Sequence, residues 1–133
     1  MKRFLPLVIT LALGQALQAQ KMRDVFAAMP DSVLGIMTKN NRLDCIDFIE
    51  NTMAAKVHNR FDGDTELKAL TVDYLELQLT KNCRVEMKLL PSEDTLYYIC
   101  VARTYSGPMA ETKVALYTPD WETLPEEKWM SRP

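Results

Sequence analysis

The sequence contains little of what enzyme and metal sites are usually built from. Its 133 residues include one histidine and three cysteines, with no CxxC spacing. A structural zinc site draws its four ligands from closely spaced pairs, and one histidine with three scattered cysteines does not form such a set, so none is predicted. A Ser-His-Asp or Cys-His nucleophile would have to use His58, and the alternation of His58 with Lys56 and Arg60 predicts an exposed strand face. We therefore predict no catalytic residue, no metal ligand and no cofactor, and we favour a non-enzymatic protein.

The small number of cysteines also argues against a disulfide framework. An odd number leaves at least one cysteine unpaired within a monomer. A hairpin that turns near Ser92 would place Cys83 opposite Arg103 and away from Cys100. Cys45 falls on the apolar side of a predicted helix. Because a free cysteine behaves as a small core residue, we expect three buried thiols.

The chain has no apolar run long enough to span a membrane as a helix, which takes about 20 residues. Its longest apolar stretch, Phe4–Leu13, follows the cations of Met1-Lys2-Arg3 and precedes small residues that end at Ala19. This order predicts a secretory signal peptide over residues 1–19, cut after Ala19 or, as a second choice, after Ala16. The alternative is a buried helix of the folded domain. No cysteine lies near the cut, so no lipoprotein anchor is predicted.

An excess of basic residues is also missing. Cleavage would remove Lys2 and Arg3 and change the formal charge from −2 to −4. Nucleic acids and anionic membranes attract clustered cations, so neither is expected as a partner. We expect a periplasmic or extracellular protein whose partner is another protein or a second copy of itself.

No repeat, low-complexity tract or long linker divides the remaining chain. We therefore predict one α+β domain over residues 20–118 and a tail with proline and tryptophan over residues 119–133. Apolar residues at helical spacing predict a helix at 22–28, a helical turn at 33–37 and a longer helix at 42–54. The expected N-cap of the longer helix is Asn41, with Asp44 three residues later. Its buried stripe is predicted to contain Leu43, Ile46, Ile49 and Met53.

After Ala55 the apolar period becomes two, which predicts strands. Asp62-Gly63-Asp64 is a turn signal. About five antiparallel strands are expected in a meander, with the helices packed on one face of the sheet. The expected strands lie near residues 56–61, 74–79, 84–89, 96–102 and 113–118.

Two groups of oxygen side chains could be mistaken for cation sites. Asp44, Asp47 and Asn51 share one helical face, but acidic residues are expected near a helix N-terminus. Asp62, Asp64 and Glu66 resemble the start of a calcium loop, but the glycine is misplaced and the later bidentate glutamate is missing. We interpret the first group as a solvated face and the second as a hairpin turn.

The last predicted strand is the candidate interaction site. In a meander the final strand lies at an edge unless a later strand covers it. The tail after Pro119 contains several prolines and no alternating apolar run, so it is not expected to supply one. The candidate interaction residues are Lys113, Val114, Leu116 and Trp121. Trp121 either contacts a partner or holds the tail on the domain, and the sequence leaves both alternatives open.

Five segments of the chain carry a family resemblance. They are Met22-Arg23-Asp24-Val25-Phe26, Met29-Pro30-Asp31-Ser32, Thr38-Lys39-Asn40-Asn41-Arg42-Leu43-Asp44, Ala69-Leu70-Thr71 and Thr118-Pro119-Asp120-Trp121. With them the chain resembles an uncharacterised family of exported Bacteroidales proteins, domain of unknown function 3256. The resemblance covers nearly all of the chain after the signal peptide. It implies export into a Gram-negative envelope and assigns no catalytic or binding residue. It also implies longer relatives, and so predicts that the tail is truncated.

The expected function is that of a small exported binding or interaction domain. Two alternatives remain open at this point. One is a small envelope hydrolase that uses carboxylates, for which Asp44 and Asp47 would be the candidates. The other is a structural fragment that is completed by dimerisation.

Overall fold

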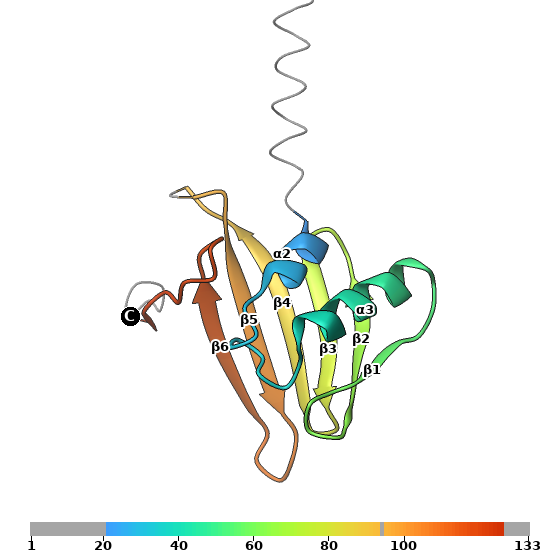
Figure 1. Cartoon of the computed structure of the whole chain (residues 1–133). Helices are drawn as coiled ribbons and strands as arrows, with labels where there is room; N and C mark the ends of the chain where they lie inside the picture. The colour runs from blue at the N-terminus through green and yellow to red at the C-terminus, as the bar shows by residue number, and fades with distance from the viewer. Residues whose placement is uncertain (1–20, 94, 127–133) are drawn as a thin grey trace, which may run out of the picture.

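The computed structural model describes residues 21–93 and 95–126. Within these residues two helices precede six strands, which pair in chain order as one antiparallel meander, so the α+β prediction is confirmed (Figure 1). The predicted signal peptide lies outside the described residues. The elements are α2 (Met22–Ala28), α3 (Lys39–Glu50), β1 (Ala55–His58), β2 (Asp64–Leu70), β3 (Tyr74–Thr80), β4 (Cys83–Pro91), β5 (Tyr97–Tyr105) and β6 (Glu111–Tyr117).

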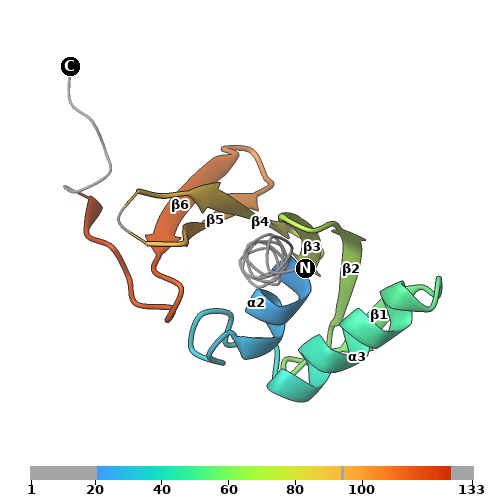
Figure 2. The same ribbon diagram turned by 90° about the horizontal axis from the view of Figure 1, so that it is seen from above.

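Both helices lie on the same side of the sheet (Figure 2). Alternate strand residues point to that side because successive side chains of a strand face opposite ways. The core between the two layers includes Leu77, Val85 and Ile99 from the strands and Phe26 and Cys45 from the helices. α3 packs on β1 and β2, and α2 packs on α3. None of the described helices is long and apolar enough to cross a membrane.

The sheet has six strands rather than about five, because β2 was not predicted from the sequence. Its residues Thr65 and Leu67 are buried on the helix side. The pairing with β3 shifts between Leu67 and Ala69, so a bulge interrupts the alternation. Because β2 begins with polar residues and contains this bulge, its sequence does not show the alternation of apolar and polar residues that predicts a strand.

The N-terminal cap of α3 is Thr38, not the predicted Asn41. The Thr38 Oγ1 accepts a hydrogen bond from the Asn41 amide at 3.1 Å, and the Asn41 side chain accepts one from the Thr38 amide at 3.0 Å. This reciprocal pair is a capping box with asparagine in the third position. Residues 31–36 form successive turns rather than a helical turn, and α3 ends at Glu50 rather than residue 54.

The buried stripe of α3 also differs from the prediction. Leu43 and Met53 are exposed by 43% and 56%, whereas Arg42 is exposed by only 1%. The Arg42 guanidinium donates to the backbone carbonyls of Phe26 and Met29 and to the Asp31 carboxylate at 2.9 Å. A buried cation is tolerated when its donors are satisfied in this way. Arg42 therefore joins α3 to the segment that follows α2.

The three cysteines are free thiols, as predicted. Cys45 and Cys83 are buried and Cys100 is half-buried. Cys83 pairs with Tyr105 rather than Arg103, because the β4–β5 hairpin turns between Pro91 and Tyr97.

Candidate functional site

Among the residues that the structure describes, β6 is an edge strand whose outer side is covered at only one end. Its inner side pairs with β5 from Glu111 to Tyr117 without a register shift. On the outer side the tail turns back after Thr118 and forms one bridge, between Tyr117 and Thr123. In this bridge the Leu124 amide donates to the Leu116 carbonyl at 2.9 Å. As expected, the described part of the tail supplies no strand, but this single bridge pairs it with the end of β6.

The orientation of the remaining backbone groups follows from that hydrogen bond. The Leu116 carbonyl points away from β5, and alternate residues of a strand point their amide and carbonyl groups the same way. Thr112 and Val114 therefore direct their backbone groups to the outer edge. Within residues 95–126 and 21–93 these groups have no backbone partner. The open part of the edge is short and is centred on these two residues.

The four residues predicted for interaction separate into two pairs. Lys113 is exposed and Val114 is exposed by 40%, so both are accessible at the open edge. Leu116 and Trp121 are buried. The Trp121 indole Nε1 donates to the Val25 carbonyl at 3.2 Å, and its ring lies 5.2 Å from the Tyr117 ring. Trp121 thus holds the tail on the domain, which resolves the two alternatives for this residue.

A hollow of about 260 Å³ lies beside the open edge. It is on the helix side of the sheet, because Arg103 reaches across to donate to the Val33 carbonyl. Its lining combines apolar and cationic side chains. The lining residues are Val101, Arg103, Tyr105, Lys113, Val114, Ala115 and Tyr117.

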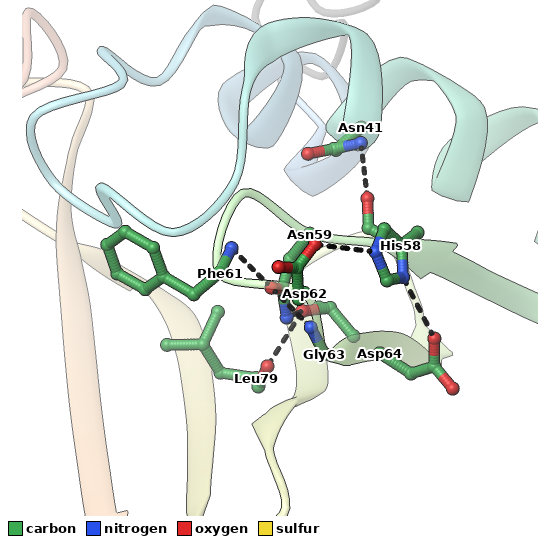
Figure 3. Close-up of polar contacts among 9 residues, drawn as sticks. Asn41, His58, Asn59, Phe61, Asp62, Gly63, Asp64 and Leu79 are labelled. Atoms are coloured by element: carbon green, nitrogen blue, oxygen red, sulfur yellow. Dashed lines mark hydrogen bonds and ion pairs between the residues drawn. The ribbon is translucent and has the colours of Figure 1, made fainter.

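The β1–β2 loop is the second feature of interest, and Figure 3 shows its polar contacts. The buried Asn59 organises it. The Asn59 Oδ1 accepts from the amides of Phe61 at 2.9 Å and Gly63 at 3.1 Å, and its Nδ2 donates to the Thr65 hydroxyl at 3.0 Å. That hydroxyl donates to the Leu79 carbonyl at 2.7 Å. An asparagine that bonds the backbone two residues later is a common turn device, but the alternation of Val57, Asn59 and Phe61 suggested only a strand.

The same loop displays Phe61 to solvent. Phe61 is 74% exposed and points away from His58 (Figure 3), contrary to its predicted place in a strand. A hollow of about 570 Å³ lies alongside, lined by Phe61 and Ile36 among mostly polar side chains. His58 lies between two carboxylates, with Nε2 at 3.3 Å from Asp62 and Nδ1 at 3.7 Å from Asp64. All three side chains of this group are more than half exposed.

The remaining candidates from the sequence have ordinary structural roles. Asp44 and Asp47 are exposed on α3. The side-chain Nδ2 of Asn51 donates back to the Asp47 backbone carbonyl at 2.7 Å. Glu66 forms an ion pair with Lys68 at 3.3 Å, so its carboxylate is directed to a lysine and not to a cation shared with Asp62 and Asp64. Among the residues described, no group of three or more His, Cys, Asp and Glu is placed to hold a metal ion.

Burial controls the chemistry of the thiols. Burial raises the pKa of Cys45 to about 11, and it also raises the pKa of Cys83 and of Cys100. The thiolate is the nucleophilic form of cysteine. At neutral pH these three side chains are therefore protonated and suited to packing rather than to nucleophilic chemistry.

Comparisons with known proteins agree with the fold. No curated protein matches the chain. A solved structure, described as a domain of an uncharacterized protein from Porphyromonas gingivalis W83, superposes with a TM-score of 0.69 at 26% identity. The match covers 84% of this chain and 57% of that one, so this chain spans little more than half of its relative. The model of the family "Protein of unknown function (DUF3256)" matches residues 14–133, and the chain belongs to that family.

Proposed function

We propose that this protein is an exported interaction domain that binds a protein segment as an added strand along β6. The observation that carries the proposal is the open edge at Thr112 and Val114. A strand added there would exchange main-chain hydrogen bonds with these two residues, and the exposed Val114 side chain would contact it. Native sheet proteins usually cover or blunt such an edge, so an uncovered stretch is a place for a partner.

The export part of the proposal is supported by the order of the N-terminal segments. Two cations, a ten-residue stretch that is apolar except for Thr10 and a small residue at Ala19 follow one another as in secretory signal peptides. N-terminal sequencing of the protein from cells should begin at Gln20. A native protein that begins at Met1 would contradict export by this route.

Hydrogen exchange on the dilute monomer tests the binding part. The amides of Thr112 and Val114 point outward and should exchange fast. The amides of Lys113 and Ala115 point toward β5 and should exchange slowly, like those of the central strands. This alternation along one strand is a signature that simple fraying of β6 would not produce. Equal protection of all four amides in a monomer would show that the edge is already covered and would contradict the proposal.

A further inference from the structure

We propose that the strand added to β6 is β6 of a second copy, paired antiparallel about a two-fold axis through Thr112. This inference rests on the proposed function and names its partner. A two-fold interface uses the same surface of both molecules. Four features of β6 and its flanks fit one such arrangement.

The backbone supplies the first feature. A two-fold axis through an outward-pointing residue places Thr112 opposite Thr112 of the second copy, where the two residues exchange both of their hydrogen bonds. Val114 then lies opposite Ala110 of the second copy. The hydrogen bonds of this register on β6 therefore fall on Thr112 and Val114, which form the open part of the edge.

The tail supplies the second feature, because it excludes a register centred further along the strand. An axis through Val114 would require Leu116 to pair with Thr112 of the second copy. The Leu116 carbonyl already accepts from the Leu124 amide. The contact is therefore restricted to the part of β6 before Leu116.

Charge supplies the third feature and selects among the registers that remain. An axis through Lys113 or through Glu111 would place two like charges directly opposite each other, which is destabilising. The axis through Thr112 instead places Glu111 opposite Lys113 of the second copy, twice over. Both side chains are exposed and lie on the same face of the sheet. Within the described chain neither of them has an ion-pair partner.

The β5–β6 loop supplies the fourth feature. The same register brings Met109 of one copy opposite Ala115 of the other, beside the hollow of about 260 Å³. Met109 is 90% exposed in the single chain. An unbranched thioether side chain fills irregular apolar gaps well, and Val101, Ala115 and Tyr117 offer it an apolar wall.

Sedimentation velocity of the processed protein over a range of concentrations tests the inference. The wild type should dimerise, and Glu111→Lys and Lys113→Glu should each weaken the dimer by about tenfold, because each places two like-charged pairs in the interface. An equimolar mixture of the two variants should recover a heterodimer, since both facing pairs between positions 111 and 113 then combine opposite charges. Glu93→Lys is the control, because it makes the same charge change at the β4–β5 turn.

The outcomes separate this inference from the proposed function. A dimer that is indifferent to both charge reversals would overturn the register. A wild type that stays monomeric while the Thr112 and Val114 amides exchange fast would overturn self-pairing and leave strand addition by another protein. A monomer in which those amides are protected would overturn both proposals. Recovery of the dimer only in the mixture would establish the register.

Discussion

The two edge strands of the sheet are protected in different ways. β1 has four residues, and segments before it in the chain bond to its outer side at its end: the Asn41 side chain donates to the His58 carbonyl at 3.4 Å, and just beyond the strand the Arg60 amide donates to the Ile36 carbonyl at 3.1 Å. β6 has seven residues, and within the described part of the chain the tail covers it only at its end. The helices lie beside β1 and leave β6 bare (Figure 1). The comparison shows that the helical layer protects only one of the two edges, and the strand addition proposed above uses the other.

The largest loss of stability should come from replacing Arg42, which joins α3 to the segment that follows α2. Arg42→Met removes two hydrogen bonds from a charged donor to the buried carbonyls of Phe26 and Met29, each worth about 1.5–3 kcal/mol. We expect denaturant unfolding to show a loss of roughly 3–6 kcal/mol, the sum over the two hydrogen bonds. Asp31→Asn is the control, because Asp31 is half exposed and its loss should cost less. Equal losses for both variants would mean that the ion pair and not the carbonyls matters most.

The second prediction concerns the face of α3 that covers β1 and β2. Ile46→Ala should destabilise the protein by about 2–4 kcal/mol, the range for truncating a buried isoleucine. Leu43→Ala should stay within about 0.5 kcal/mol, because Leu43 is on the exposed side. Thermal or denaturant unfolding of the two variants would compare them directly. The reverse order would show that α3 packs through Leu43.

The third prediction uses pH to probe the same layer. The pKa of Cys45 is raised by burial from its usual value near 9 to about 11, so the folded state holds the proton more tightly than the unfolded state. Its contribution to stability is therefore complete below about pH 9 and is lost as the pH rises toward 11, amounting to at most about 3 kcal/mol. Cys45→Ala should flatten the fall in unfolding free energy over this window. An unchanged slope would assign the fall to other groups.

The smallest effect should be found on the open side. Val114→Pro removes an amide that points outward and has no hydrogen bond to β5, so it should cost less than about 1 kcal/mol. Lys113→Pro removes an inward amide of the β5–β6 ladder and should cost considerably more. Unfolding of the two variants by urea measures the difference. If Val114→Pro is the more harmful change, then Val114 points toward β5 and the edge is not open there.

The sequence predicts the regular strands of the fold. It does not predict features that depend on contacts between residues far apart in the chain. Leu75, Leu77 and Leu79 alternate without interruption, so β3 was visible from its period alone. β2 was missed because its bulge after Leu67 breaks the period. The buried face of α3 was assigned wrongly, because an apolar pattern counts Leu43 as buried and Arg42 as exposed. In the structure three acceptors on other segments hold Arg42 in the interior, and Leu43 faces solvent.

The candidate site was predicted in outline for a similar reason. A last strand in a meander lies at an edge by order alone, so Lys113 and Val114 were expected at an exposed edge, and the structure places them there. The burial of Trp121 depends on a carbonyl of α2, far away in the sequence, so no local pattern could decide it. The turn-back of the tail onto Leu116 and Tyr117 was missed because a single bridge needs no apolar alternation.

The bond between Trp121 and Val25 also has a kinetic meaning. These residues are 96 positions apart, so one of the first described residues and one of the last must meet before the core is complete. Contacts of such long sequence separation form late, because a large loop must close before they do. The N-terminal helix therefore cannot be fully packed until the tail has been made. If the chain is exported as proposed, this last packing step can take place only after both ends of the domain have reached the far side of the secretory channel.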